Sequence, residues 1–271
     1  MSAAMIDPSA RIEAGAKIGK DVSIGPYCIV GPDVTIGEGC RLVGHVSLSG
    51  HTTIGPRTVI YPFASLGSPP QSVKYRGGPT RLLVGADCDI REGVTMNTGT
   101  EDGGGITEVG EKCLFMVGCH VGHDCKLGKN VTLANNVLLG GHVTVGDYVV
   151  FGGSSGVLQF VRIGEGAMIA GMSAVRADTI PWGLVRGRPA ILSGLNVVGM
   201  RRRGVSKAEI HQVRAAYRTL FLGDGEFRAR LARVAAEYSA VPLVAAIIEF
   251  IRAGKGPLTH ADASDMADEE I

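Results

Sequence analysis

Three histidines, His120, His123 and His142, are crowded into one short region of the chain. Two chemistries suit such a group. Imidazoles from neighbouring segments can bind a divalent metal. Alternatively, one imidazole with a pKa of about 6.5 can act as a general base, taking a proton from a hydroxyl or amine that attacks a thioester. A histidine on a protein surface is more often simply solvated, so the choice depends on the elements that position these three.

A six-residue rhythm organises the first two-thirds of the chain. Aliphatic residues recur at every sixth position and are often followed by Gly or another small residue. This period predicts a parallel β-helix, in which each hexapeptide supplies one short strand and one turn. The first run holds Ile6, Ile12, Ile18, Ile24, Val30, Ile36, Leu42, Leu48, Ile54, Ile60 and Leu66, and the rhythm resumes over 84–96 and, shifted by one, over 109–175.

The composition agrees with a β-helix. We expect the 40 glycines among 271 residues at the corners, where the chain needs tight bends or positive φ angles. A narrow column also predicts few aromatic residues inside it. Each of the six cysteines lies four positions after a marked aliphatic residue, which indicates small buried hydrophobes rather than disulfides or metal ligands. They are Cys28, Cys40, Cys88, Cys113, Cys119 and Cys125.

The repeat also decides between the two chemistries. Three hexapeptides form one triangular coil of about 18 residues, which places Gly141 over His123 and His142 over Asp124. A glycine above an imidazole leaves open space and exposes a backbone N–H that can hold the oxyanion of a tetrahedral intermediate. A metal site lacks a convincing third ligand at the neighbouring-coil spacing. We therefore favour general-base catalysis.

A column of this width is filled by its own side chains, so an active site must lie on its outer faces, in clefts between packed columns. Two excursions interrupt the rhythm and can supply such clefts: residues 67–81, which are polar and rich in Pro and Gly, and residues 100–108. Tolerated surface insertion is the alternative for both. The triple glycine of the second is not a phosphate-binding loop, because the following Lys-Ser/Thr is missing.

The chain divides near residue 187 into a β-helix over 1–187 and a helical region over 188–259. Ser206 and Glu209 are spaced as a capping box before a first helix, and further helices are predicted over 226–238 and 243–252. The acidic tail, 260–271, is expected to be loose. The net charge of +1 gives no indication of nucleic-acid binding. Without a signal peptide or a membrane-length apolar run, we expect a cytoplasmic protein.

The sequence resembles the UDP-N-acetylglucosamine O-acyltransferases over essentially its whole length. The most specific stretch runs His120-Val121-Gly122-His123-Asp124-Cys125, followed by Leu133-Ala134-Asn135-Asn136 and Gly140-Gly141-His142-Val143. Gln159-Phe160, Asn196-Val197 and Arg201-Arg202-Arg203-Gly204 add support. The N-terminal hexapeptides alone would be weak evidence, because many acyltransferases share them.

The resemblance implies a left-handed parallel β-helix, a homotrimer and active sites between neighbouring subunits. The implied reaction moves a 3-hydroxyacyl chain from acyl carrier protein to the sugar 3-position of UDP-N-acetylglucosamine, the first step of lipid A synthesis, without a metal or cofactor. His123 would be the general base and Asp124 its orienting partner, a pairing that requires a corner at this place. The Gly141 N–H would hold the oxyanion.

The resemblance also implies a set of substrate contacts. Gln71 and Lys74 would contact the sugar and phosphates, and His120, His142 and Gln159 would line the same cleft. Asn196, Arg202 and Arg203 would contact the nucleotide from the adjoining subunit, although a solvated basic turn is the alternative for the arginines. A basic rim would attract the acidic carrier protein. Gly171 matches the position that reads acyl length, and its missing side chain predicts a long acyl chain, although the neighbouring Met172 could shorten the groove.

Three positions depart from the family pattern. Ser72 stands where an Asp is usual, Leu158 where a His is usual, and Val198 where a Glu is usual. The first two would lie near the acceptor sugar, and each removes a charged or ionisable group. We therefore keep a second hypothesis for the acceptor: a UDP-sugar with an amine in place of the 3-hydroxyl, giving an amide product.

Other functions are also compatible with hexapeptide repeats. The later N-acyltransferase of the same pathway carries a domain ahead of its β-helix, whereas repeats begin here at Ile6. Short-chain acetyltransferases that use coenzyme A lack the histidine run and the helical C-terminus. A non-catalytic β-helical scaffold would not be expected to place a histidine cluster opposite a polar excursion.

Overall fold

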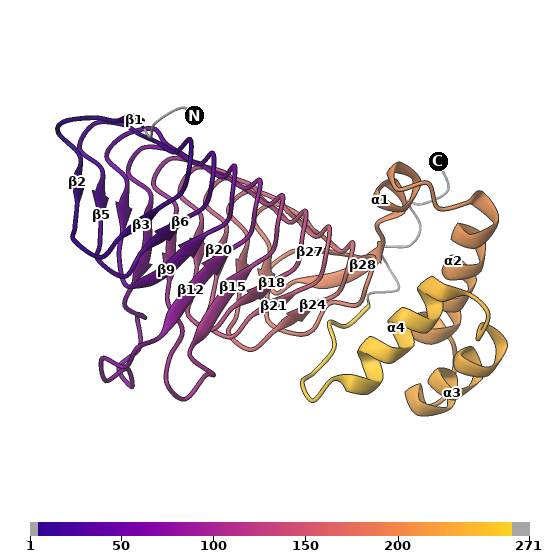
Figure 1. The fold of residues 1–271 in the computed structure, drawn as a ribbon. Helices are drawn as coiled ribbons and strands as arrows, with labels where there is room; N and C mark the ends of the chain where they lie inside the picture. Colours follow the sequence, from indigo (N-terminus) through magenta and orange to yellow (C-terminus); the bar gives the residue numbers. More distant parts are fainter. Residues whose placement is uncertain (1–4, 262–271) are drawn as a thin grey trace.

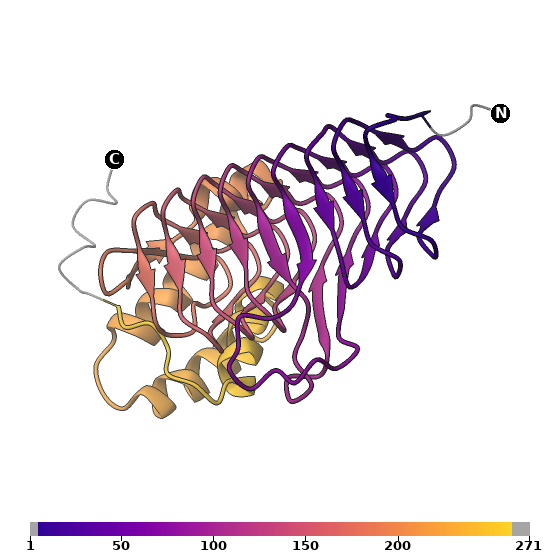
Figure 2. The ribbon, with the colours of Figure 1, turned by 90° about the vertical axis from the view of Figure 1, so that its left-hand side faces the viewer.

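The structure is a computed structural model that describes residues 5–261. Its main body is a three-sided column of short parallel strands, a left-handed parallel β-helix, with helices at its C-terminal end (Figure 1). We name its three sides sheets A, B and C. Two loops, residues 69–80 and 98–105, leave the column on one side (Figure 2). They coincide only in part with the predicted excursions 67–81 and 100–108, because residues 67–68, 81 and 106–108 belong to strands.

Each side of the column is one sheet. Sheet A comprises β1 (Met5–Ile6), β4 (Ser23–Ile24), β7 (Arg41–Leu42), β10 (Val59–Ile60), β13 (Asp89–Ile90), β16 (Leu114–Phe115), β19 (Thr132–Leu133), β22 (Val150–Phe151), β25 (Met168–Ile169), β27 (Gly183–Arg186) and β28 (Ile191–Leu195). Sheet B comprises β2 (Arg11–Ile12), β5 (Ile29–Val30), β8 (Ser47–Leu48), β11 (Ser65–Ser68), β14 (Thr95–Asn97), β17 (His120–Val121), β20 (Leu138–Leu139), β23 (Gly156–Val157) and β26 (Ala174–Val175). Sheet C comprises β3 (Lys17–Ile18), β6 (Thr35–Ile36), β9 (His51–Ile54), β12 (Arg81–Val84), β15 (Ile106–Val109), β18 (Lys126–Leu127), β21 (Thr144–Val145) and β24 (Arg162–Ile163).

The strand register confirms the predicted coil. Leu133 pairs with Phe151, the equivalent residue one coil further on, and the other uninterrupted coils pair in the same way. The marked aliphatic residues point inward and, from Ile24 onward, are buried. All six cysteines are buried and none is in a disulfide, so their interpretation as small core residues is confirmed.

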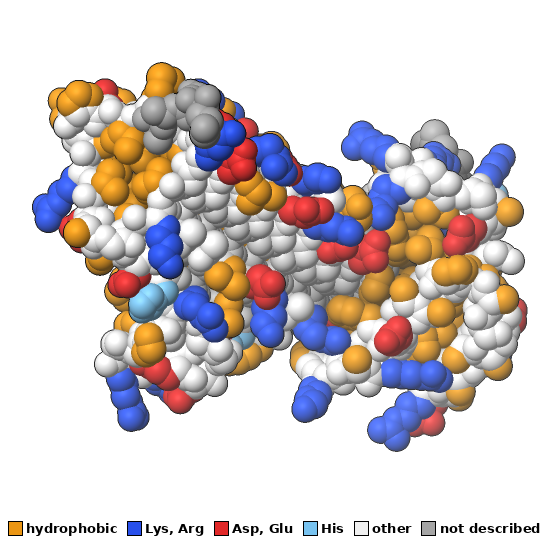
Figure 3. Space-filling view, in the orientation of Figure 1, with side chains coloured by type: hydrophobic (Ala, Val, Ile, Leu, Met, Phe, Trp, Pro, Cys, Tyr) orange, Lys and Arg blue, Asp and Glu red, His pale blue; other side chains and the backbone are white. Residues whose placement is uncertain are grey.

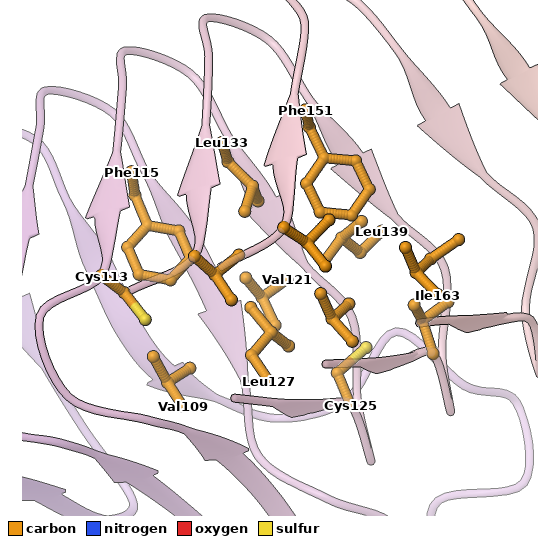
Figure 4. Packing of buried hydrophobic residues seen from close by; sticks show 14 of the residues in the cluster. Val109, Cys113, Phe115, Val121, Cys125, Leu127, Leu133, Leu139, Phe151 and Ile163 are labelled. Atoms are coloured by element: carbon orange, nitrogen blue, oxygen red, sulfur yellow. The ribbon is translucent and has the colours of Figure 1, made fainter. Parts of the chain in front are cut away.

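Two expectations about composition need correction. Aromatic rings do enter the column: Phe115 and Phe151 are fully buried on sheet A, two coils apart, with Leu133 between them (Figure 4). The smaller leucine in the intervening coil leaves room for both rings. The interior therefore tolerates aromatic residues when a smaller residue occupies the coil between them.

The corners are not occupied by glycine alone. Many residues with positive φ are not glycine, including Asp124 at 59° and His142 at 61°. Glycine is instead required where one coil touches the next, because a Cβ on Gly25 would lie 2.1 Å from the carbonyl oxygen of Val43. The abundance of glycine thus reflects close stacking of the coils as well as bending of the chain.

The column ends in a hairpin and a helical region. β27 and β28 pair antiparallel, and the chain continues into α1 (Val197–Arg202), α2 (Lys207–Leu222), α3 (Phe227–Glu237) and α4 (Pro242–Ala253). The Ser206 side chain accepts a hydrogen bond from the Glu209 N–H at 3.1 Å, as the capping motif predicted. The six-residue α1 was not predicted. The division at residue 187 stays a prediction.

The segment after α4 returns to the column. The Asp178 N–H donates to the carbonyl of Pro257, and the Leu192 N–H donates to the carbonyl of His260. Most of the acidic tail lies outside the described residues. Among residues 5–261, no helix combines the length and the apolar character needed to cross a membrane.

Candidate active site

A corner of the column brings His123 and Asp124 side by side. β17 ends at Val121, and the turn that follows places Asp124 at a positive φ of 59°. Successive side chains of a strand would point to opposite faces, but here His123 Nδ1 lies 2.8 Å from Asp124 Oδ2. Since a carboxylate only accepts, Nδ1 carries the proton, and the other ring nitrogen, Nε2, is left as the basic atom.

Asp124 is held from several directions. Its carboxylate accepts hydrogen bonds from the Thr100 N–H at 2.9 Å and the Thr100 hydroxyl at 2.6 Å. Its own N–H donates to Thr107 Oγ1 at 2.8 Å. Only 1% of the Asp124 side chain is exposed. The carboxylate is therefore fixed, and through it the plane of the His123 ring.

The triple glycine of the second excursion explains this burial. A Cβ on Gly103 would lie 2.3 Å from the Asp124 carboxylate, so only glycine lets the loop close over it. The Gly103 N–H also donates to Thr100 Oγ1 at 3.1 Å. The second excursion thus covers His123 and Asp124, which we call the catalytic dyad, and is not a passive surface insertion.

Gly141 lies directly over the His123 ring, as the stacking predicted. A Cβ there would come within 2.5 Å of His123 Cε1 and 2.6 Å of Nε2. The next residue continues the stack, because the His142 N–H donates to the His123 carbonyl at 2.8 Å. The Gly141 N–H makes no hydrogen bond within residues 5–261. A free backbone donor thus lies beside the basic nitrogen, where an oxyanion can be held.

The other two histidines are built into the same surface. The His142 ring meets the His123 ring edge-on at 5.0 Å and stacks on Phe160 at 4.4 Å. His120 Nδ1 lies 2.8 Å from Thr95 Oγ1. Burial lowers the pKa of both His142 and His120 below the ordinary value. Asp124 partly opposes this shift at His142, and the neighbouring His123 lowers the pKa of each further. Both imidazoles are therefore kept neutral near pH 7.

The structure also brings together three side chains that could in principle bind a metal ion, a grouping that the sequence did not reveal. Ligand atoms of His123, Asp124 and His142 all lie within 4.8 Å of one another. However, the Asp124 oxygens already accept from the Thr100 N–H, the Thr100 hydroxyl and His123 Nδ1. A metal would have to displace these donors. The arrangement fits an oriented base better than a ligand set.

A cleft of about 550 Å³ opens in front of the dyad. We call it the catalytic cleft. It lies on sheet B and on the corner between sheets B and C. Its lining includes five of the predicted site residues: Gln71, His120, His123, Gly141 and Gln159. His142, which was predicted to line the same cleft, lies behind His123 and outside this lining. The lining also includes Asn97, Leu138, Leu158 and Arg176, of which only Leu158 drew attention in the sequence.

The first excursion reaches this cleft through Gln71. Its base is fastened by Asn97, whose Nδ2 donates to the Pro69 carbonyl at 2.9 Å. Ser72 organises the turn that follows, because its hydroxyl accepts from the Lys74 N–H at 3.3 Å. Ser72 and Lys74 themselves lie outside the cleft lining, further along the loop.

The predicted nucleotide residues lie elsewhere. Asn196, Arg202 and Arg203 line a second cleft, of about 680 Å³, with Tyr148, Met168, Trp182 and Val198. We call it the sheet A cleft, since the outward residues of β22, β25 and β27 form its floor. The two clefts therefore lie on different sides of one column.

Two of these residues also have roles within the chain. The Asn196 side chain caps α1, accepting from the Gly199 N–H at 2.9 Å and donating to the Gly166 carbonyl at 2.8 Å. The Arg203 guanidinium lies 3.3 Å from the centroid of the Tyr148 ring. Both fix the wall of the sheet A cleft.

Gly171 lies apart from both clefts. It occupies the corner between sheets A and B, and a Cβ there would meet the Gly153 carbonyl oxygen at 3.2 Å. The next residue, Met172, is 55% exposed on the same corner. Nothing beyond this placement bears on its predicted role in reading acyl length.

Thr100 and Thr107 are the main site residues that the sequence did not point to. Thr107 occupies an inward position of sheet C, where a hydroxyl instead of an aliphatic side chain is a detectable irregularity. Thr100 opens the second excursion, whose fold has no period from which its contact with Asp124 could be derived.

Comparisons with known proteins agree with this geometry. A family profile described as UDP-N-acetylglucosamine O-acyltransferase, domain 2, matches residues 178–258. A profile of bacterial transferase hexapeptides matches residues 15–50 and 106–141. The chain is 55% identical over 212 residues to the acyl-[acyl-carrier-protein]–UDP-N-acetylglucosamine O-acyltransferase of Azorhizobium caulinodans, covering 78% of each chain. It is 50% identical over 194 residues to the one from Rhizobium leguminosarum, covering 72% of this chain and 71% of that one.

Solved structures are similar over nearly the whole chain. A UDP-N-acetylglucosamine acyltransferase superimposes with a TM-score of 0.92 at 40% identity, covering 95% of this chain and 99% of that one. The UDP-N-acetylglucosamine O-acyltransferase of Moraxella catarrhalis gives 0.91 at 38% identity, covering 94% and 99%.

Proposed function

The chain belongs to the UDP-N-acetylglucosamine O-acyltransferase family, and from this premise we propose how its residues carry out the reaction. The enzyme transfers an acyl group from acyl carrier protein to UDP-N-acetylglucosamine, in lipid A synthesis. In our proposal the group is a 3-hydroxyacyl chain and the acceptor position is the sugar 3-hydroxyl.

His123 is the general base of the proposed mechanism. Its Nε2 takes the proton of the 3-hydroxyl as that oxygen attacks the thioester carbonyl. The new C–O bond forms while the carbonyl π-electrons move to the oxygen, which the Gly141 N–H stabilises. Collapse of this intermediate breaks the C–S bond, and the His123 imidazolium returns the proton to the departing sulfur. Asp124 stabilises the imidazolium between these steps.

One observation carries this proposal: His123 and Gly141, whose N–H makes no hydrogen bond within residues 5–261, lie side by side in the lining of one cleft. Gly141 approaches so closely that a Cβ would lie 2.6 Å from His123 Nε2. Asp124 fixes the ring from the opposite nitrogen at 2.8 Å. Gln71, His120 and Gln159, on the cleft wall, would bind the sugar.

We propose that the working form is a homotrimer. The base lines the catalytic cleft on sheet B, whereas Arg202, proposed to bind the diphosphate with Lys74, lines the sheet A cleft. One column cannot bring these two sides together. A second copy can, if its sheet A faces the sheet B of the first, and three copies then close a ring.

The edge shared by sheets A and B supports this arrangement. In a ring of that kind it points toward the threefold axis. Three rings, Tyr27, His45 and Phe63, stack along it with centroid separations of 5.0 and 5.3 Å. Tyr27 and Phe63 are 62% and 67% exposed, which is unusual for aromatic side chains unless a partner covers them.

The carrier protein would approach from the helical region. Residues 188–259 contain 12 Lys and Arg against 5 Asp and Glu. Basic side chains lie around the rim of the helices (Figure 3). Such a surface steers an acidic partner. We also propose a cytoplasmic location, where carrier-bound acyl donors and six unpaired cysteines both fit a reducing compartment.

A 3-amino UDP-sugar is the second candidate acceptor. Leu158 lines the catalytic cleft where the family usually has a histidine, and it is 54% exposed there. Ser72 replaces an aspartate on the loop that carries Gln71. Both replacements change the polarity around the acceptor sugar while the dyad is intact.

One experiment tests acceptor, donor and reaction class together. The protein is incubated with a mixed pool of 3-hydroxyacyl carrier proteins and with both the 3-hydroxyl and the 3-amino UDP-sugar, and products are identified by mass spectrometry. An ester carrying a long acyl chain is expected. A dominant amide would establish the second candidate, a medium-length chain would contradict the role given to Gly171, and no acylated sugar would refute the proposed function.

A further inference from the structure

The two excursions are tied together by one side chain. Glu101 Oε1 accepts hydrogen bonds from the Gly78 N–H at 2.7 Å and from the Arg76 N–H at 3.2 Å. Glu101 belongs to the second excursion, and the two N–H groups belong to the first. Its carboxylate therefore fastens the outer part of the first excursion, which also carries Gln71 and Lys74.

The first excursion is shaped to receive this carboxylate. A Cβ on Gly78 would lie 2.6 Å from Glu101 Oε1 and 2.7 Å from its Cγ, so a side chain there would displace the carboxylate from this contact. The Tyr75 hydroxyl donates to the Gly78 carbonyl at 2.9 Å and closes the loop around the contact. Hydrogen bonds from its own backbone N–H and, less strongly, from those of Gly78 and Arg76 lower the pKa of Glu101, in keeping with a carboxylate that is bound in its charged form.

The residue before Glu101 contacts the catalytic dyad of His123 and Asp124. Thr100 donates to Asp124 from both its N–H and its hydroxyl. One dipeptide thus contacts the base's partner on one side and the substrate loop on the other. The dipeptide therefore ties the outer part of the first excursion to the catalytic dyad, in addition to the bond from Asn97 at the base of that excursion.

We propose that Glu101 is a positioning residue that sets the first excursion, and with it Gln71 and Lys74, at the distance from His123 that the UDP-sugar requires. This rests on the proposed function. Glu101 itself touches no reacting atom. Its loss leaves the dyad in place but lets the loop move, so it weakens acceptor binding more than the chemical step.

The test is steady-state kinetics and calorimetric binding of UDP-N-acetylglucosamine with the full-length protein. Glu101→Ala is expected to raise KM and Kd for the UDP-sugar by about 5- to 10-fold, with kcat and the KM for the acyl carrier within about 2-fold. Glu101→Gln keeps an acceptor oxygen and should recover much of the affinity. Gly78→Ala disrupts the same contact from the first excursion, so its KM and Kd for the UDP-sugar should resemble those of Glu101→Ala.

Asp102→Ala is the matched control. Asp102 is an exposed neighbouring carboxylate that makes no hydrogen bond or ion pair with any residue between 5 and 261. The inference is overturned if Glu101→Ala binds the sugar as tightly as Asp102→Ala, or if its kcat falls in proportion to affinity. A wild-type protein that neither binds nor acylates the sugar would instead refute the proposed function, and would remove the basis of this inference with it.

Discussion

At the scale of single residues, the site is defined by what surrounds one imidazole. His123 has a fixed carboxylate at Nδ1 and a glycine above its ring. His120 and His142 share the surface but are held by Thr95 and by Phe160. The three histidines therefore have different tasks, and substitutions at each should give different results.

Replacing His123 with alanine should lower kcat by about 100-fold or more, because the acceptor's proton then lacks the imidazole that Asp124 orients as the base. The KM for the UDP-sugar should change little, and the melting temperature should be maintained. Initial rates with purified acyl carrier protein measure the effect. His211→Ala, an exposed histidine on α2, is the control, and equal activity in the two variants would contradict the role of His123.

Acid should destabilise the fold partly through His120 and His142. Burial lowers the pKa of both in the folded state below the ordinary histidine value of about 6.5. The unfolded chain therefore binds more protons as the pH falls below about 6.5, and the free energy of unfolding decreases in that range. Melting temperatures measured between pH 8 and pH 5 should fall less steeply in a His120→Asn, His142→Asn variant. An unchanged slope would mean that neither histidine is kept neutral by the fold.

The sequence predicted those contacts that follow from the coil period. Once the repeat is known, the position of Gly141 over His123 follows from the length of one coil, because the two residues are about one coil apart. Thr100 could not be found in this way, since its contact with Asp124 depends on how a non-repeating loop folds back. Asn196 shows the reverse case: the resemblance assigned it to the nucleotide, and the structure gives its amide a capping role as well.

At the scale of elements, periodic segments were predictable and short or irregular ones were not. The strands and α2 follow from spacing and from the Ser206 cap. The six-residue α1 is too short to show a helical period. The second excursion was undecided in the sequence, yet it forms the cover over Asp124.

Gly103→Ala tests that cover. A Cβ would lie 2.3 Å from the Asp124 carboxylate, so either the loop or the carboxylate must move. Misplacement of the dyad should lower kcat by about 10- to 100-fold with little change in melting temperature. The neighbouring Asp102→Ala provides a kinetic baseline. Full activity of Gly103→Ala would show that the excursion is an ordinary surface loop.

At the scale of the whole molecule, the separation of the two clefts has the largest consequence. The catalytic cleft lies on sheet B with its B–C corner, and the sheet A cleft holds Arg202. A period gives the order of residues around the column, but it cannot say which side of one column meets which side of another. The family resemblance implied a trimer, but the faces proposed to meet in it could be assigned only after the site residues had been placed on the column.

Mixed trimers test whether each site is shared. His123→Ala and Arg202→Ala should each have low activity alone. In a site built from His123 of one copy and Arg202 of the next, random 1:1 mixing gives about one quarter of sites with both residues intact. Co-expression of the two variants with one shared affinity tag, followed by purification of all trimers and rate measurement, should recover activity in that proportion. A site contained in one chain would recover none, because every chain carries one of the two changes.

The reciprocal mixture makes the result decisive. When wild-type chains are mixed 1:1 with chains carrying both changes, a shared site again needs two intact neighbours, so activity per chain should be about one quarter of wild type. A site within one chain would give about one half. If the site lies between copies, both mixtures should have about one quarter of the wild-type activity. If the site lies within one chain, their activities should differ, and such a difference would refute the arrangement of sheet B against sheet A.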